Sequence, residues 1–282
     1  MNKDEMMKLI EPPTPFKDNA PKLMVQEDEI DFAINNYNEK IGHKNEIDDI
    51  QCDKCKNKGL IAFKDYDDFY GVYELNYKPC ECFRKRQLVN IAIKNGFEHL
   101  IKVSSKDYKK EYDWQKENYE KLVRYCMVEN DTNKWFIAIG QIGSGKTLIA
   151  SIVANNILKN TNREIFYINW LSFINNLKRN IANDNITEVN DDLEHLKKVD
   201  VLFLDDVLKN YVQTDLKYIY EIINYRYVND KKTIFTSEYI VDELLNIDQA
   251  TFSRAIEKAS GYIIDNDKDR KRNIRLNGLD IK

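Results

Sequence analysis

The chain has 282 residues, 43% of them hydrophobic and 32% charged, and its formal net charge at pH 7 is −4. This length allows one substantial domain plus a smaller one. The acidic balance excludes a uniformly basic nucleic-acid coat, but it leaves room for local basic patches such as residues 84–86 and 268–275. No apolar run approaches the roughly 20 residues of a membrane-spanning helix, and no secretory signal opens the sequence. We therefore expect a cytoplasmic protein with no membrane partner.

Residues 1–50 are expected to form a flexible and partly helical leader. Four of the five prolines lie between Pro12 and Pro21, which favours extended chain in that stretch. The segment EDEIDFAINNYNEKI (residues 27–41) is compatible with a short helix.

Residues 51–100 form a cysteine-rich module that holds four of the five cysteines. They come as two close pairs, Cys-x-x-Cys and Cys-x-Cys, separated by residues 56–79. A reducing cytoplasm disfavours disulfides, and a thioredoxin-type redox site needs a neighbouring βαβ pattern that this segment lacks. Two close pairs suit a structural zinc ion held by four thiolates, with unrelated reduced cysteines as the alternative. The predicted zinc ligands are Cys52, Cys55, Cys80 and Cys82.

Residues 88–96 favour a helix that stops at Gly96, and residues 105–282 are typical of one α/β domain. In this domain, strand-like apolar runs alternate with segments of helical periodicity, which predicts a parallel sheet with helices on both faces. The predicted strands are residues 135–140, 164–169, 199–206, 232–237 and 261–266. The predicted helices are residues 112–129, 147–160, 170–181, 215–228, 241–246 and 250–259. Within the first of these helices, the lone Cys126 is interpreted as buried packing.

The segment GQIGSGKT (residues 140–147) matches the pattern G-x-x-x-x-G-K-[ST] at every fixed position, directly after a predicted strand and before a predicted helix. Its glycines allow backbone N–H groups to turn toward phosphate oxygens, and the following helix adds the positive end of its dipole. Lys146 can reach the β- and γ-phosphates, and the Thr147 hydroxyl can ligate Mg²⁺. We therefore predict an ATP site formed by Gly140, Gln141, Ile142, Gly143, Ser144, Gly145, Lys146 and Thr147.

The predicted strand of residues 199–206 ends in VLFLDD, with two carboxylates at its end. Asp205 is placed to hold Mg²⁺ together with Thr147. Asp206 is the candidate catalytic residue that orients or deprotonates the attacking water.

Hydrolysis also needs a polar group that senses the γ-phosphate and positive charge that neutralises the transition state. For the first role, the end of the next predicted strand offers Thr236, Ser237 and Glu238. For the second role, the sequence offers Arg254 in a predicted helix and two residues of the basic tail, Arg270 and Arg272.

These motifs, in this order, resemble those of the AAA+ ATPases and, more narrowly, of the DnaC/DnaI-type helicase loaders in the form common in Gram-positive bacteria and their phages. The resemblance covers about residues 50–280 and rests on CDKCKNKG, CECFRKR, GQIGSGKT, VLFLDDV, INYRY and FSRAIE. It implies an ATPase that delivers a hexameric replicative helicase of DnaB type onto single-stranded DNA and contacts that helicase through the N-terminal module. It also implies self-association through the AAA+ face when ATP is bound.

By this resemblance, Arg254 matches the arginine finger that completes the ATP site of a neighbouring subunit. Arg270 matches the sensor-2 arginine, with Arg272 as the fallback. The family commonly ends its sensor-1 strand in Thr-Ser-Asn, whereas this chain has Glu238, a carboxylate that only accepts hydrogen bonds and repels phosphate. Either a neighbouring hydroxyl takes the sensing role, or turnover is slow and ATP acts mainly as an assembly switch. In the second case, Glu238→Asn should raise turnover.

Two other functions stay open. A transposition ATPase of the IstB type shares the core but regulates a transposase, and a weakly hydrolysing adaptor or inhibitor binds the helicase with little turnover. The cysteine module favours the loader, and Glu238 keeps the adaptor open. For single-stranded DNA, a stacking and phosphate-tracking surface is offered by Trp170, Phe173, Lys178 and Arg179, with core packing as the alternative for the two aromatic residues.

Overall fold

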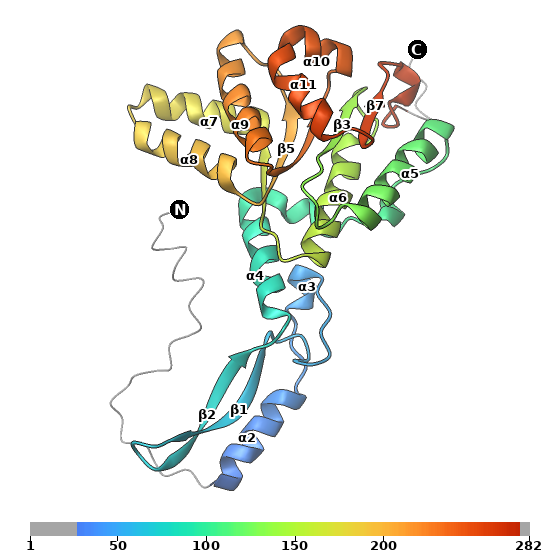
Figure 1. The fold of residues 1–282 in the computed structure, drawn as a ribbon. Coiled ribbons are helices and arrows are strands. Elements are labelled where there is room, and N and C mark those ends of the chain that lie inside the picture. Colours follow the sequence, from blue (N-terminus) through green and yellow to red (C-terminus); the bar gives the residue numbers. More distant parts are fainter. Residues whose placement is uncertain (1–26, 277–282) are drawn as a thin grey trace. The chain divides into compact units, whose positions relative to one another are not determined.

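The computed structural model describes residues 27–276 and divides the chain into two compact units, Met1–Gln87 and Leu88–Lys282 (Figure 1). The proline-rich part of the predicted leader lies outside the described residues. The boundary between the units falls inside residues 51–100, which we assigned to the cysteine-rich module, so the last residues of that segment belong to the second unit. The assignment of the functional domains stays a prediction.

The first unit is built on a two-stranded antiparallel hairpin, β1 (Leu60–Asp67) and β2 (Val72–Pro79). Helix α2 (Glu27–Glu39) packs against this hairpin. The side chain of Asn38 donates to the Ala62 carbonyl at 2.9 Å and accepts from the Ala62 amide at 3.0 Å. The short helix predicted for this stretch is therefore confirmed, whereas we did not predict the hairpin.

Two further helices complete the chain around the cysteines. Helix α3 (Asn45–Asp48) precedes the first cysteine pair, and α4 (Phe83–Ala92) follows the second. Helix α4 continues as a π-helical turn, η1 (Ile93–Phe97), in which Gly96 has a left-handed φ of 89°. Glycine adopts this conformation readily and other residues rarely do, so the predicted stop at Gly96 is confirmed.

The second unit contains, within residues 88–276, a five-stranded sheet in the order β4-β5-β6-β3-β7 (Figure 1). Each pair of neighbouring strands is parallel. The predicted parallel sheet is thus confirmed, and its carboxyl edge collects the ends of the strands that carry the sequence motifs. The strands are β3 (Phe136–Gly140), β4 (Ile165–Asn169), β5 (Val201–Val207), β6 (Lys232–Ser237) and β7 (Ile263–Asn266).

Helices cover both faces of the sheet (Figure 1). On one face, Ile137, Leu204 and Phe235 join a buried cluster with the helices that follow β4, β5 and β6. Helix α6 packs against β3 and β6, and α5 packs against α6. The connection from β3 to β4 runs across the sheet in the opposite direction to the later connections between strands. Because crossover connections between parallel strands are right-handed, α6 lies on the other face of the sheet.

Within residues 88–276 of the second unit, the α-helix bounds follow the predictions closely, and α8 is a helix that we did not predict. No helix within residues 27–276 is long and apolar enough to cross a membrane. The helices of the second unit are α5 (Asp113–Val128), α6 (Lys146–Asn160), α7 (Trp170–Ala182), α8 (Ile186–Lys198), α9 (Leu216–Val228), α10 (Val241–Ile247) and α11 (Gln249–Lys258).

Candidate functional site

The loop between β3 and α6 is shaped by three glycines. Gly140, Gly143 and Gly145 have left-handed φ angles of 99°, 76° and 87°. A side chain at Gly140 would place its Cβ 1.8 Å from the carbonyl oxygen of Asn266, and one at Gly143 would place it 2.0 Å from the side chain of Asn273. The first two glycines are therefore required for space as well as for backbone conformation.

Lys146 is a buried cation inside this loop, with 7% of its surface exposed. Its ammonium donates to the carbonyl oxygens of Gly140 at 3.0 Å and Gln141 at 2.8 Å. Burial lowers the pKa of Lys146, and the neighbouring carboxylates of Glu238 and Asp206 partly offset this effect. The lysine thus lies where the phosphate-binding pattern predicts it.

Asp205, at the end of β5, is the centre of a hydrogen-bond network. Its Oδ1 accepts from the hydroxyls of Thr147 at 2.9 Å and Thr236 at 2.6 Å. Its Oδ2 accepts from the Tyr167 hydroxyl at 3.1 Å. Burial raises the pKa of Asp205, and the hydrogen bonds from these hydroxyls lower it. The fold therefore brings together Thr147 and Asp205, the predicted Mg²⁺ ligands, and adds Tyr167, which we did not predict.

Asp206 lies beside a lysine that we also did not predict. Its backbone has a left-handed φ of 57° next to a register shift between β5 and β6. The Asp206 carboxylate accepts from Lys209 Nζ at 2.9 Å, and the same ammonium lies 3.1 Å from Glu238 Oε1. Glu238 is therefore not an uncompensated negative charge.

These side chains line a pocket of about 230 Å³ beside the phosphate loop. Lys146 and Thr147 face it from the loop, and the other elements contribute Asp206, Lys209, Glu238, Ile274 and Arg275. A turn lined by glycines without room for Cβ atoms, a buried lysine and a hydroxyl paired with a carboxylate are together a donor set that fits a nucleotide phosphate chain with Mg²⁺.

The arginines of the basic tail lie in different places. Arg275 lines the pocket. Arg270 begins a 3₁₀ turn, η5 (Arg270–Arg272), and Arg272 pairs with Asp267 at 3.0 Å. Neither Arg270 nor Arg272 is among the described residues that line the pocket. The sensor-2 role of Arg270 stays a prediction, and Arg275 is a second candidate by its position.

Arg254 lies on α11 and does not line the pocket in the described chain. Its guanidinium donates to the Ala250 carbonyl and lies 5.8 Å from the ring centroid of Tyr220 and 6.0 Å from that of Tyr227. An arginine finger acts on a neighbouring subunit, so this placement leaves the predicted role of Arg254 as a prediction.

The hydroxyls proposed for γ-phosphate sensing point into the protein. Ser237 is fully buried and donates to the Val207 carbonyl at 2.8 Å. Thr236 is also fully buried and donates to Asp205. Ser144 of the loop is buried and accepts from the Asn266 side chain at 3.1 Å, whereas Ile142 lines the pocket.

The four predicted zinc ligands meet in the first unit. The Sγ atoms of Cys52, Cys55, Cys80 and Cys82 all lie within 4.8 Å of one another. The Cys52–Cys80 separation is 3.8 Å and the Cys55–Cys82 separation is 3.5 Å, and the four residues are free thiols. Tetrahedral zinc with Zn–S bonds of about 2.3 Å places its sulfur ligands about 3.8 Å apart, so this cluster fits the ion. Cys126 lies outside the cluster and is half-buried, whereas we interpreted it as buried packing.

Arg86 supports the cysteine cluster from α4. It is 2% exposed, its Nε donates to Cys82 Sγ at 3.4 Å, and its Nη1 lies 2.6 Å from each carboxylate oxygen of Asp48. A buried arginine paired with a carboxylate cannot serve as an exposed nucleic-acid contact. Residues 84–86 are therefore not one continuous basic surface patch.

The proposed aromatic surface for single-stranded DNA is mostly core. Trp170 is 1% exposed and belongs to the buried cluster of the second unit, against which Phe173 packs. Lys178 pairs with Asp215 at 2.7 Å. The alternative of core packing is therefore confirmed for the two aromatic residues, because α7 turns them toward the sheet.

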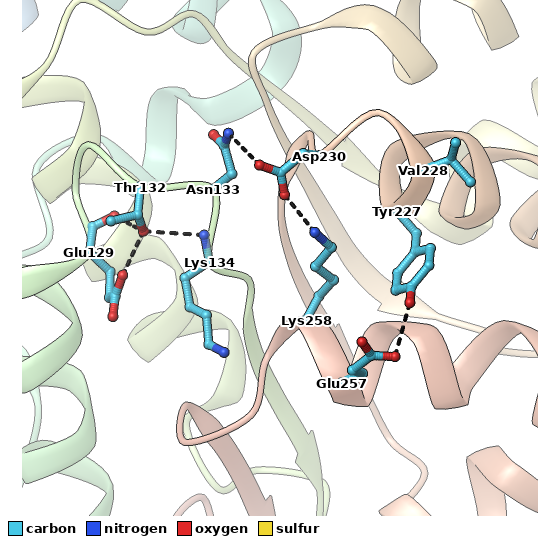
Figure 2. A pocket seen from close by; sticks show the side chains of 9 residues that line it. All are labelled: Glu129, Thr132, Asn133, Lys134, Tyr227, Val228, Asp230, Glu257 and Lys258. Atoms are coloured by element: carbon cyan, nitrogen blue, oxygen red, sulfur yellow. Dashed lines mark hydrogen bonds and ion pairs between the residues drawn. The ribbon is translucent and has the colours of Figure 1, made fainter.

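A larger hollow of about 600 Å³ lies at the amino ends of β3 and β6, the opposite edge of the sheet from the phosphate loop. Figure 2 shows that its polar groups mostly pair with one another. Asp230 accepts from Lys258 at 2.5 Å and from Asn133 at 3.0 Å, and Tyr227 donates to Glu257 at 3.0 Å. These interactions link the segments that follow α5 and α9 to the end of α11. They do not indicate a ligand for this hollow.

The sheet order, the phosphate loop and the Asp205 network define an ATP-binding P-loop domain of the AAA+ class. A family model described as "IstB-like ATP binding protein" matches residues 81–260. This match covers more than half of the chain, and the chain belongs to that family.

Curated relatives are similar to parts of this chain. YqaM of Bacillus subtilis is 30% identical over 201 residues, which cover 66% of this chain and 62% of YqaM. XkdC of the phage-like element PBSX in the same species is 25% identical over 226 residues, which cover 76% of this chain and 81% of XkdC. The replicative helicase loader DnaC of Buchnera aphidicola (subsp. Schizaphis graminum) is 30% identical over 133 residues, which cover 46% of this chain and 52% of that protein.

Among solved structures, a crystal structure of the DnaC helicase loader has a TM-score of 0.50 at 19% identity, covering 61% of this chain and 99% of that one. A crystal structure of DnaI has a TM-score of 0.46 at 22% identity, covering 62% of this chain and 92% of that one. At these identities the DnaC likeness concerns the fold alone. It agrees with the predicted AAA+ class.

Proposed function

We propose that the protein is an ATP-dependent loader that delivers a hexameric replicative helicase onto single-stranded DNA. The observation that carries this proposal is the contact of Thr147 with Asp205 at 2.9 Å, because it assembles the two halves of an ATP site in a chain that also holds a four-cysteine cluster. A relative named as a replicative helicase loader supports it.

In this proposal, the phosphate loop binds the triphosphate of ATP. Lys146, now bound to loop carbonyls, would turn to phosphate oxygens, while Thr147 and Asp205 would hold Mg²⁺. The ion supplies charge neutralisation when bound. Asp206 orients or deprotonates the attacking water. Arg254 from a second copy would complete the site, so ATP binding would favour self-association.

The first unit would contact the helicase. Its small hairpin offers little apolar core, so a zinc ion held by the cysteine cluster would supply the missing stability. Arg86 and Asp48 orient the second cysteine pair and would keep this scaffold in one shape.

The decisive test is co-purification with the replicative helicase, with and without ATP, combined with ATP hydrolysis in the presence of single-stranded DNA. We expect ATP-dependent co-purification and DNA-stimulated turnover. Lys146→Ala should lose nucleotide binding and helicase delivery, whereas Lys198→Ala, an exposed control on α8, should retain both. Delivery by Lys146→Ala at the wild-type level would exclude the ATP-driven mechanism.

Two other functions give different outcomes in the same test. The family description IstB-like favours a transposition ATPase, which would co-purify with a transposase and not with the helicase. A carboxylate at the pocket, Glu238, favours a weakly hydrolysing adaptor or inhibitor. That protein would bind the helicase, and its turnover would stay near background when single-stranded DNA is added.

A further inference from the structure

We propose that Lys209 binds the γ-phosphate of ATP and that Glu238 positions the Lys209 side chain. The pair would then sense the γ-phosphate in place of an asparagine after β6. The proposal rests on the proposed ATP site and deepens it. Lys209 is the residue whose ammonium joins the two strand ends at the pocket, with 2.9 Å to Asp206 and 3.1 Å to Glu238.

The hydroxyls of the β6 end are committed elsewhere. Thr236 donates to Asp205 at 2.6 Å, and Ser237 donates to Val207 at 2.8 Å, and both residues are fully buried. A γ-phosphate in the pocket would therefore need another donor on this side. Lys209 lines the pocket and carries a donor there.

The hydrogen-bond capacity of Lys209 fits this role. An ammonium has three N–H donors, and two are directed at Asp206 and Glu238, which leaves one for a phosphate oxygen. Pairing with these carboxylates also raises the pKa of Lys209, so the side chain stays charged at neutral pH.

The backbone holds Lys209 in place. The preceding residue, Leu208, is fully buried and has a left-handed φ of 65°. The backbone amide of Lys209 donates to the Asp206 carbonyl at 3.1 Å. The turn is thus anchored in the core. Lysine has a flexible stem, so a second anchor at its tip, Glu238, reduces the freedom lost when phosphate binds.

The balance of charges at the pocket indicates that Glu238 holds Lys209 in position. Two carboxylates, Asp206 and Glu238, face a pocket that should accept a polyanion, and unpaired they would repel it. Lys209 neutralises part of this charge and presents an ammonium between them. Glu238 is therefore a positioning residue.

The test compares affinities for ADP and for a non-hydrolysable ATP analogue, each with Mg²⁺, in the full chain. Lys209→Ala should weaken the analogue by about 10-fold or more, the loss expected for a charge-assisted hydrogen bond, and change ADP affinity by less than about twofold. Lys209→Arg should recover most of the loss. Lys64→Ala is the matched control, because Lys64 also bridges two carboxylates, Glu27 and Asp31 at 2.8 Å each, in the other unit.

The positioning role is tested with Glu238→Ala and the double variant. We expect Glu238→Ala to weaken the analogue less than Lys209→Ala does, and the double variant to be no weaker than Lys209→Ala alone. Equal losses for both nucleotides, no loss, or tighter binding of the analogue by Lys209→Ala would overturn the inference.

The inference and the proposed function fail separately. A wild-type protein that binds both nucleotides but never co-purifies with the helicase overturns the loader, whereas the affinity test of Lys209 still decides the inference. A wild-type loader whose Lys209→Ala variant keeps its preference for the triphosphate overturns the inference alone. A wild-type protein that binds neither nucleotide overturns both.

Discussion

The Tyr167 hydroxyl lies 3.1 Å from Asp205 Oδ2, while the ring centroid of Tyr167 lies 5.6 Å from that of Phe97. Phe97 belongs to η1, the turn that follows α4. Tyr167 therefore connects Asp205, the proposed Mg²⁺ ligand, to a turn that lies outside the sheet. A hydroxyl that holds one oxygen of a metal ligand limits the orientations of that ligand.

Tyr167→Phe keeps the ring and removes the hydrogen bond. We expect the Mg²⁺ concentration that half-saturates nucleotide binding to rise roughly 5- to 10-fold, because Asp205 loses a partner that orients it. Mg²⁺ titrations with a fluorescent nucleotide measure this. The matched control is Tyr227→Phe, which removes a hydroxyl bound to Glu257 at 3.0 Å outside the pocket. Identical titration curves for the two variants would contradict the prediction.

Loss of a cysteine of the cluster should remove the metal and loosen only the first unit. Wild-type protein is expected to hold about one zinc per chain by elemental analysis, and Cys52→Ser and Cys80→Ser should lose it. Limited proteolysis should then cut the first unit faster while nucleotide affinity is kept. Cys126→Ser, outside the cluster, should keep its zinc, and a metal-free wild type would refute the zinc site.

Two glycines with similar backbone conformations should respond differently to alanine. Gly261 has a φ of 86°, and the atom nearest to its Cβ position, Nη2 of Arg124, lies at 3.8 Å, an ordinary van der Waals distance. Gly261→Ala should therefore lose only the left-handed conformational term, about 1–2 kcal/mol. Gly140→Ala also pushes against the Asn266 backbone, so its free energy of unfolding should fall by at least about 2 kcal/mol more. Equal losses in denaturant titrations would show that the loop can move aside.

Lys232 should make stability depend on pH. It is fully buried at the start of β6, and burial lowers its pKa to about 7. Between this value and the ordinary lysine pKa of about 10.4, the unfolded chain binds more protons than the folded one, so stability rises with pH. Below pH 7 both states are protonated and the full penalty for burying the charge is present.

Lys232→Met removes this titration. The difference in unfolding free energy between wild type and variant should therefore shift in favour of wild type as pH rises from about 7 to 10, by up to about 1.4 kcal/mol per pH unit. Thermal melts across this window measure the shift. Lys231→Met, at the neighbouring, less buried position, is the control. A constant difference across the window would mean that Lys232 keeps an ordinary pKa in the folded protein.

Much of the ATP site could be predicted because its residues act locally. The glycine pattern of residues 140–147, the apolar run before Asp205 and the alternation of helices with strands each depend on near neighbours in the chain. The cysteine pairs are also local, and their spacing alone indicated one cluster. Tyr167, Lys209 and Arg275 were missed because nothing adjacent in sequence marks them. Aromatic residues are common in strands, lysines are common in turns, and arginines are expected in a basic run. None of these three residue types therefore indicates a binding site by its position in the sequence.

By itself, then, the sequence determined the class of fold, the phosphate loop, its partner carboxylate and the cysteine cluster, since backbone conformation and strand periodicity are set by a few consecutive residues. Only the tertiary structure decided that Glu238 faces Lys209, that Ser237 turns inward and that Arg86 is buried against Asp48. Each of these depends on which segments the sheet order and the packing bring together. The same residue types would have other partners under another strand order.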